Sequence, residues 1–229
     1  MTKICQIKMN RAPAQAELPF RTHGGRRRGA GRPRRSDQLS HTARPSLDGK
    51  NHPVHLTLRM AREVWNLRSE RGLRCVELAL EEEKARGELR VVHFSVQGNH
   101  LHLVAEANDA PTLSRRMQCF GIRLARGLNK MMKRRRGRVL ADRYHARVLR
   151  TPREVNRTIR YVLLNHHIHR ARAGEDGPRF DPFSSAAPPR TSTEGTGTGR
   201  ATGPPTSPPE TWVLARGWLR GGAFDLGVE

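Results

Sequence analysis

The feature that most limits the fold of this chain is a pair of short segments separated by only two residues. In both segments apolar and polar side chains alternate. Residues 89–97 and 100–107 both alternate apolar and polar side chains, and Gly98 and Asn99 connect them. A loop of two residues with glycine first suits a type II′ hairpin turn and fixes which residues of the two strands lie opposite each other. The sequence therefore predicts an antiparallel hairpin in the middle of the chain.

The register of this hairpin separates its side chains into two faces. Gln97 is predicted to lie opposite His100 and Ser95 opposite His102, while His93 lies opposite a valine, so that these polar side chains share one face. The other face is apolar, and we expect helices to cover it. Its predicted members are Phe94, Val96, Leu101, Leu103 and Ala105.

Periodic patterns on both sides of the hairpin predict the remaining elements. Residues 52–60 and 139–150 have the alternation of strands, and residues 75–86 and 111–131 have the apolar spacing of helices. A last helix is predicted after Thr151, because proline and glutamate follow it at the positions of a capping box. The order β-α-β-β-α-β-α predicts an α+β fold, an antiparallel sheet with helices packed on one face.

The strong positive charge of the chain limits its function. The chain has 43 Lys and Arg against 21 Asp and Glu, a formal net charge of +22, which excludes an ordinary neutral enzyme of small metabolites and favours a polyanionic partner. We favour nucleic acid over a membrane surface, because the basic residues are spread through the chain. The residues most suited to contact nucleic acid are Arg26, Arg27, Arg28, Arg32, Arg34, Arg35, Lys133, Arg134, Arg135 and Arg136.

Composition divides the chain into four parts. Residues 1–51 are rich in Arg, Gly and Pro without apolar periodicity and predict a disordered basic arm that binds DNA. Residues 52–170 contain all the periodic patterns and predict one domain. Residues 171–210 are rich in Gly, Pro, Ser and Thr and predict a flexible linker. Residues 211–229 contain Trp212 and Trp218 and are expected to dock on the domain, with stacking on a base as the alternative.

Cysteine usage and hydropathy predict a cytoplasmic protein. Cys5, Cys75 and Cys119 lie far apart and are odd in number, so neither a disulfide framework nor a cysteine zinc site is expected. No stretch approaches the roughly 18 apolar residues that span a membrane, and the first residues contain no apolar segment of a secretory leader. We therefore expect no membrane partner.

The hairpin carries the strongest candidate for a chemical site. His100 and His102 are two residues apart on a strand, so their side chains point the same way and both imidazoles can ligate one divalent ion. Two histidines on a solvated face are the alternative that this spacing leaves open. Asn165 can add an amide oxygen if the last helix crosses that face. Imidazole and oxygen ligands together suit Mg²⁺ or Mn²⁺ at a phosphate better than a structural zinc site.

Tyr161, on the last helix, is the candidate nucleophile. A metal beside a DNA phosphate neutralises the non-bridging oxygens, which makes the phosphorus open to attack by a phenol. The alternative is a tyrosine that packs between the helix and the sheet. Tyr144 is the only other tyrosine, and we interpret it as a packing or DNA-contact residue.

Two runs of sequence, in this order, resemble the single-tyrosine HUH transposases, which mobilise single-stranded insertion sequences. The runs are HFSVQGNHLHLVAEA (residues 93–107) and IRYVLLNHHIHRAR (residues 159–172). The basic run GGRRRGAGRPRR (residues 24–35) is similar to the arm that precedes the domain in the REP-associated tyrosine transposase branch. The resemblance covers roughly residues 52–170 together with this arm.

This resemblance implies a ferredoxin-like sheet, with the nucleophile on the final helix. His100 and His102 correspond to the metal ligands of the family and Tyr161 to its nucleophile. The family cleaves and rejoins single-stranded DNA near hairpins through a 5′-phosphotyrosine intermediate, without water or ATP. Insertion-sequence members commonly have Gln one turn after the nucleophile, where this chain has Asn165, as REP-associated relatives tend to have. Relatives act as homodimers or alone, and the sequence leaves both open.

Two other functions fit the same residues. A protein of this fold could bind DNA or RNA hairpins without cutting them. A metal nuclease could instead use Asn165, His166 and His167 to hydrolyse DNA with water, although His166 falls on the predicted apolar stripe of the last helix. A covalent protein–DNA adduct that depends on Tyr161 would separate the transposase from both alternatives.

Overall fold

The computed structural model describes residue 47 and residues 52–172, 181–187 and 205–222, without the side chains of residues 165 and 167–172. The order β-α-β-β-α-β-α is confirmed, and two short helices follow it. The elements are β1 (Val54–Arg59), α1 (Glu70–Arg86), β2 (Leu89–Val96), β3 (His100–Ala107), α2 (Ala110–Met131), β4 (His145–Val148), α3 (Pro152–Arg172), α4 (Trp212–Ala215) and the 3-10 helix η1 (Gly217–Gly221). The predicted contacts of the arm lie outside the described residues: Arg26, Arg27, Arg28, Arg32, Arg34 and Arg35.

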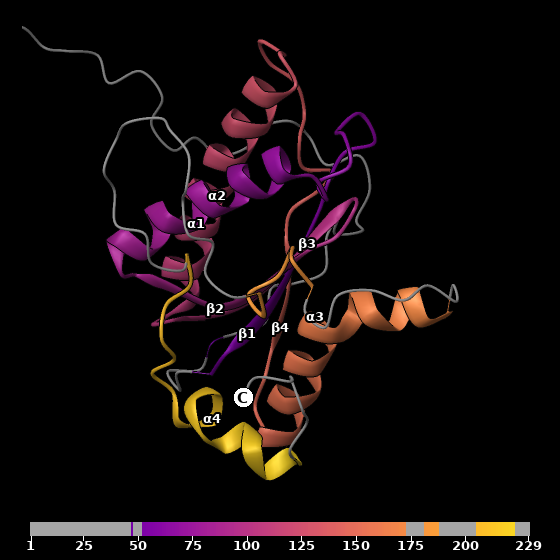
Figure 1. The fold of residues 1–229 in the computed structure, drawn as a ribbon. Helices are drawn as coiled ribbons and strands as arrows, with labels where there is room; N and C mark the ends of the chain where they lie inside the picture. Colours follow the sequence, from indigo (N-terminus) through magenta and orange to yellow (C-terminus); the bar gives the residue numbers. More distant parts are fainter. Residues whose placement is uncertain (1–46, 48–51, 173–180, 188–204, 223–229) are drawn as a thin grey trace, which may run out of the picture. The chain divides into compact units, whose positions relative to one another are not determined.

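The four strands form one antiparallel sheet in the order β2-β3-β1-β4 (Figure 1). Strand β1 therefore lies in the interior of the sheet, between the hairpin strand β3 and the short strand β4. This order, with one helix after β1 and another after β3, is the arrangement of a ferredoxin-like fold. The predicted α+β class and antiparallel sheet are confirmed.

From the turn as far as His93 the hairpin has the predicted register, a bulge between Val91 and His93 shifts the pairing beyond it, and the turn type differs. Ser95 lies opposite His102, and His93 lies opposite Val104, as expected. Among the described residues, however, positive φ angles occur only at other positions, so Gly98 lacks the conformation that a type II′ turn requires. The predicted turn type is wrong, while the two-residue loop still fixes the register.

Neighbouring segments hold this turn in place. The carbonyl oxygen of Gly98 accepts the backbone N–H of Leu67 at 2.9 Å, and that of Asn99 accepts the N–H of Met60 at 2.8 Å. These bonds join the turn to the loop after β1. Long-range contacts therefore stabilise a turn geometry that local sequence preferences do not predict.

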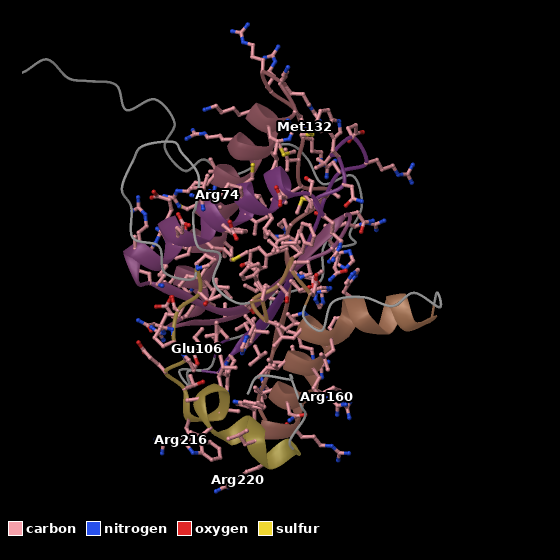
Figure 2. All side chains as sticks on the ribbon, in the orientation of Figure 1. Arg74, Glu106, Met132, Arg160, Arg216 and Arg220 are labelled. Carbon is pink, nitrogen blue, oxygen red and sulfur yellow. The ribbon has the colours of Figure 1, made fainter. Side chains whose placement is uncertain are left out.

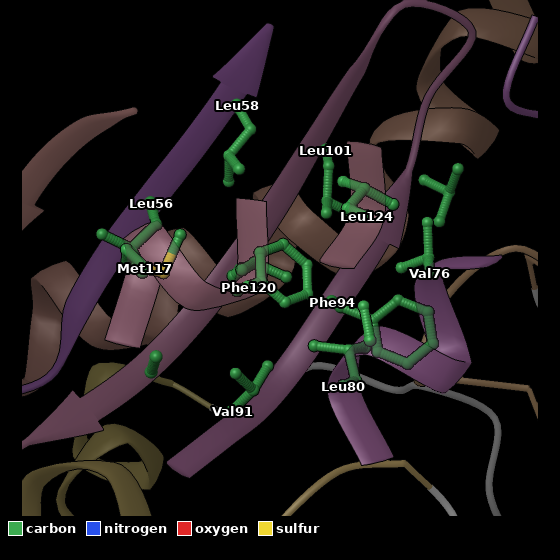
Figure 3. Packing of buried hydrophobic residues seen from close by; sticks show 14 of the residues in the cluster. Leu56, Leu58, Val76, Leu80, Val91, Phe94, Leu101, Met117, Phe120 and Leu124 are labelled. Carbon is green, nitrogen blue, oxygen red and sulfur yellow. The ribbon is translucent and has the colours of Figure 1, made fainter. Parts of the chain in front are cut away.

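Helices α1 and α2 cover the apolar face of the sheet, as expected. Figure 3 shows side chains of both helices packed against those of the strands. The apolar cluster includes Leu56, Leu58, Val76, Leu80, Phe94, Leu101, Met117, Phe120 and Leu124. Helix α1 begins five residues earlier than predicted, because the hydroxyl of Ser69 accepts the N–H of Gly72 and forms an N-cap.

A buried carboxylate joins the two helices of this layer. Glu83 on α1 is fully buried, and its carboxylate accepts hydrogen bonds from the guanidinium groups of Arg116, at 2.6 and 2.8 Å, and of Arg123. The two positive charges compensate the cost of removing the carboxylate from water. The pair of helices is thereby fixed beneath the sheet.

Helix α3 lies against the opposite face of the sheet. Val155, Ile159 and Val162 on α3 pack with Val92 and Val104 in a second buried cluster. The predicted capping box is confirmed at the start of this helix. Thr151 Oγ1 accepts the N–H of Glu154 at 3.2 Å, and Glu154 Oε2 accepts the N–H of Thr151 at 3.1 Å. The sheet thus has helices on both faces, and only α1 and α2 lie on the face where helices were predicted.

Residues 181–187, which the sequence places inside a flexible linker, instead run along the outer edge of β2. Ser184 forms a bridge with Ser95, and the backbone N–H of Val96 donates to the carbonyl of Phe183 at 2.8 Å. Asp181 is 1% exposed, and its carboxylate accepts two hydrogen bonds from Arg68, at 2.8 and 3.0 Å. A charged pair and the unpaired edge of β2 order this segment, and composition alone cannot reveal either.

Residues 205–222 pack against β3 and α3. The buried carboxylate of Glu106, labelled in Figure 2, accepts the backbone N–H groups of Glu210 and Thr211, at 2.9 and 3.0 Å, and the Thr211 hydroxyl at 2.6 Å. Leu214 is buried in the cluster beneath α3. The amide of Asn156 on α3 donates to two backbone carbonyls of η1 and the residue after it.

Candidate functional site

The face of the sheet that α3 crosses carries a cluster of histidines. His100 and His102 both project from β3 on this face. Strand pairing places Arg59 of β1 opposite His100, and Thr57 opposite His102. Because side chains alternate along a strand, His55 of β1 lies on the same face as these residues. The fold therefore gathers three imidazoles from two neighbouring strands.

His102 has two ring nitrogens in different surroundings. Its Nδ1 lies 3.1 Å from Nε2 of His55 and 3.3 Å from Oγ1 of Thr57. Its Nε2 is buried and has no hydrogen-bond partner among the described residues. Buried polar atoms nearly always have a partner, so the unpartnered Nε2 fits a position that contacts a ligand. A His102 tautomer with its proton on Nδ1 would donate to His55 or Thr57 and leave a lone pair on Nε2, as a metal ligand requires.

Both of the hydrogen-bonded histidines are neutral at physiological pH. Burial above all, together with the nearby rings of His55 and His100, lowers the pKa of His102 to about 3. Burial also lowers the pKa of His55 to about 4, with contributions from His145 and Arg147 on β4. Neutral imidazoles keep the lone pairs that metal ligation and hydrogen-bond acceptance need.

Tyr161 lies beside this cluster. Its ring centroid is 5.2 Å from that of His102 and 6.1 Å from that of His55, with the rings edge to face in both pairs. The side chain is nevertheless 44% exposed, so solvent and a substrate can reach it. Residues next to Tyr161 on α3, including Ile159 and Val162, are buried against the sheet and hold the helix in place. The tyrosine thus contacts the histidines while its outer side remains open.

His100 completes the group that the sequence predicts. Its ring centroid is 4.7 Å from that of His102, and its Nδ1 lies 2.8 Å from Oδ1 of Asn99. The structure therefore brings together His100, His102 and Tyr161, which lie on two elements that are far apart in the sequence.

The predicted third ligand, Asn165, lies on α3, but its side chain lies outside the described residues. Within the described part of the chain, no group of three His, Cys, Asp or Glu side chains could hold a metal ion. The residues nevertheless fit a partial site for Mg²⁺ or Mn²⁺. Buried, neutral His102 offers an unpartnered Nε2 and His100 lies beside it, and such ions usually complete their shell with water and phosphate oxygens.

Tyr144, the other tyrosine, has a different environment. It is half-buried and packs against the apolar cluster beneath α1 and α2. This position agrees with its interpretation as a packing residue. Tyr161 is therefore the tyrosine of the chain that lies at the histidine cluster.

Sequence reasoning missed His55 and Thr57 as parts of this site. The alternation of residues 52–60 does place both on one face of a strand, and this was the available signal. Alternation does not reveal which strand lies next to which, however. Only the sheet order brings β1 beside β3 and thus His55 within hydrogen-bond distance of His102.

The basic segment after α2 forms a second positively charged feature. Lys133, Arg135 and Arg136 are exposed, while Arg134 is half-buried and donates to the backbone carbonyl of Glu63 at 3.2 Å. Together with Arg126 and other residues of α2, the arginines line a hollow of about 520 Å³. In Figure 2, nitrogen-tipped side chains extend beyond Met132 at this end of the helix. These side chains are suited to contact phosphates.

The helices in the described part of the chain are too short or too polar to cross a membrane.

No family model matches the sequence, and no curated protein matches it. A solved structure described as "Structure of the REP associates tyrosine transposase bound to a REP hairpin" is similar, with a TM-score of 0.49 and 13% sequence identity. The similarity covers 64% of this chain and 82% of that chain. Function is therefore inferred from the residues of the site.

Proposed function

We propose that this protein is a metal-dependent transposase of the HUH type, which cleaves and rejoins single-stranded DNA near hairpins and uses Tyr161 as its nucleophile. One observation carries the proposal. The buried Nε2 of His102 has no hydrogen-bond partner among the described residues, and the ring of Tyr161 lies 5.2 Å from that of His102. The resemblance of the histidine and tyrosine runs to this class of enzyme supports the same function.

Four side chains would together hold the metal ion in the proposed site. His100 and His102 would bind the ion through ring nitrogens, and His55 and Thr57 would orient His102 through its Nδ1. A bound Mg²⁺ or Mn²⁺ neutralises the non-bridging oxygens of a phosphate. The scissile phosphate would lie between the histidine pair and Tyr161.

The proposed reaction is a transesterification. Oη of Tyr161 attacks the phosphorus, the bond from phosphorus to O3′ of the preceding nucleotide breaks, and the 3′-oxygen leaves with a proton. The phenolic proton passes to solvent, which reaches the exposed side of Tyr161. One phosphodiester replaces another, so neither water nor ATP is consumed, and attack by a 3′-hydroxyl on the phosphotyrosine reverses the step.

Basic groups around the site favour DNA as the substrate. Arg59 lies opposite His100, and the exposed Arg147 lies opposite His55. The chain as a whole has a net charge of +22. Contacts of such groups with phosphates would supply affinity and make it dependent on salt.

The proposal is tested by a search for the covalent intermediate. Labelled single-stranded DNA from the flanks of the protein's own gene is incubated with the protein and Mn²⁺ or Mg²⁺, and the products are separated under denaturing conditions. We expect an adduct with the wild type that is absent in Tyr161→Phe and retained in the matched variant Tyr144→Phe.

Three other outcomes would contradict the proposal. Tight hairpin binding without an adduct in either metal would favour a non-catalytic hairpin-binding protein. Metal-dependent cutting without an adduct would favour a nuclease that hydrolyses DNA with water. A Tyr161→Phe variant that still forms the adduct would exclude the assigned nucleophile.

A further inference from the structure

A cavity of about 670 Å³ lies at the end of β1, between the loop of residues 60–66 and the hairpin turn. Its volume falls within the range of about 300–1,000 Å³ that is usual for ligand pockets. Its lining includes Arg59, Met60, Arg62, Val64, Asn99 and Asp142. Apolar and charged side chains thus meet at an open hollow that is large enough to receive the base of a nucleotide.

The cavity adjoins the candidate site directly. Arg59, in its wall, lies opposite His100 in the pairing of β1 with β3. Asn99, also in its wall, precedes His100 in the chain, and its Oδ1 lies 2.8 Å from Nδ1 of His100. A nucleotide in the cavity would therefore be a close neighbour of a phosphate bound at His100.

Backbone hydrogen bonds hold the walls of the cavity in place. The N–H of Met60 donates to the carbonyl of Asn99 at 2.8 Å, and the N–H of Leu67 donates to that of Gly98 at 2.9 Å. Both ends of the loop are thus tied to the hairpin that carries His100. A preformed cavity avoids the entropic cost of ordering a loop when the ligand binds.

The same loop presents an exposed tryptophan. Trp65 follows Val64, which lines the cavity, and its side chain is 53% exposed. Trp212 is similarly exposed, at 49%, but its ring lies against the guanidinium of Arg220, 4.9 Å from the ring centroid. Exposed aromatic rings are a usual means by which proteins stack on unpaired bases.

The charges of the lining decide how a nucleotide would lie. Arg59 and Arg62 line the cavity and are exposed, so both can contact phosphates. Asp142, which is also exposed, lines the cavity as well, and its carboxylate, which accepts the N–H of Arg143 at 2.7 Å, would repel a phosphate placed beside it. A neutral base therefore fits beside Asp142, with the adjoining phosphate at Arg59 and Arg62.

From these features we infer that the cavity and Trp65 form a binding subsite for an unpaired nucleotide of single-stranded DNA next to the phosphate at His100. The base lies at the cavity and stacks on the indole of Trp65, while Arg59 and Arg62 contact the adjoining phosphate. The inference rests on the proposed function for the identity of the strand as DNA. This subsite would give the protein a higher affinity for unpaired than for paired DNA.

The subsite is tested by binding without chemistry. Fluorescence anisotropy in the absence of metal compares a labelled single-stranded oligonucleotide that has no self-complementarity with a duplex of the same length. We expect Trp65→Ala to weaken single-strand binding about tenfold, the effect of losing one stacked base, and to leave duplex binding unchanged. The matched variant Trp212→Ala should bind both DNAs like the wild type.

A second variant and a fold control accompany this measurement. Arg62→Ala should lower the slope of log affinity against log salt for single strands by about 0.7, as expected for one lost phosphate contact. Circular dichroism of Trp65→Ala should match that of the wild type, because the replaced side chain is exposed. Wild-type single-strand affinity in Trp65→Ala, or equal losses for both DNAs, would overturn the inference.

The two proposals fail in different ways. If the wild type forms no Tyr161 adduct, the proposed function fails, but the single-strand deficit of Trp65→Ala would still support the subsite. If Trp65→Ala binds single strands normally while the Tyr161 adduct forms, the subsite fails and the proposed function stands.

Discussion

We predict that the hydrogen bond between His102 and His55 increases the affinity of the proposed site for a metal ion. His55→Ala removes the partner 3.1 Å from Nδ1 of His102 and leaves only Thr57, at 3.3 Å, to orient the ring. Loss of such an orienting partner typically weakens metal binding by about 10–100-fold. We expect a loss of this order in the affinity for Mn²⁺, measured by isothermal titration calorimetry with the isolated protein.

His145→Ala is the matched control for this variant. His145 is exposed and lies on β4 opposite Thr57, on the same face of the sheet. Its removal should leave Mn²⁺ affinity close to that of the wild type. Equal affinities of His55→Ala and wild-type protein would show that His55 does not orient His102, the proposed metal ligand.

The lowered pKa of His93 predicts how the free energy of unfolding depends on pH. Burial lowers its pKa to about 4, below the value of about 6.5 expected in the unfolded chain. Between these two values the unfolded state binds more protons, so the free energy of unfolding falls as the pH drops from about 6.5 towards 4. We expect this decrease in the free energy of unfolding to be smaller in His93→Gln than in the wild type, by at most about 3 kcal/mol. Urea denaturation at several pH values measures the difference. Identical pH profiles of variant and wild type would contradict the assigned pKa.

Glu106 fixes the segment of residues 205–222 to the sheet. Glu106→Ala removes three hydrogen bonds to Glu210 and Thr211, which should destabilise the docked segment by about 2–3 kcal/mol. We expect faster hydrogen exchange in residues 205–222 and unchanged exchange in α1, measured by mass spectrometry. The exposed Glu88, which pairs with Arg115 at 3.0 Å, provides the matched variant Glu88→Ala. Equal protection of the segment in both variants would refute the role of Glu106.

Elements formed by local interactions were predictable from the sequence. The two-residue loop fixed the register of β2 and β3 from the turn as far as His93, and Thr151 and Glu154 marked the start of α3 correctly. Elements that depend on distant partners were not predictable. The strand expected at residues 139–150 is limited to His145–Val148, because residues 139–141 instead form backbone hydrogen bonds and a bridge with residues 59–61.

The same distinction applies to the candidate site. His100, His102 and Tyr161 belong to two short runs of sequence and could be found there. His55 required the strand order β2-β3-β1-β4. Outside the site, the position of Asp181 required an ion pair with Arg68, more than one hundred positions earlier. Contacts of this kind depend on how the chain folds as a unit, which periodicity does not report.

The charge of the chain leads to a prediction about the proposed binding of DNA. Lys133, Arg135 and Arg136 are exposed at the end of α2, and replacing all three with Ala should lower the slope of log affinity against log salt by about 2–3. Arg115→Ala, in which the lost cation was paired with Glu88, should change this slope less. The measurement is DNA binding by fluorescence anisotropy over a range of salt concentrations. An unchanged slope in the triple variant would show that these residues do not contact phosphates.

The proposed role of Tyr161 as the nucleophile can be tested by mapping the proposed covalent adduct. The protein is incubated with Mn²⁺ and single-stranded DNA from the flanks of its own gene. The products are digested with a nuclease and a protease, and tandem mass spectrometry then searches for a nucleotide attached to tyrosine. The chain has only two tyrosines, so the assignment is unambiguous. We predict that the modified peptide contains Tyr161, the tyrosine beside His102. A nucleotide attached to Tyr144, or DNA cleavage without any modified peptide, would contradict the proposed mechanism.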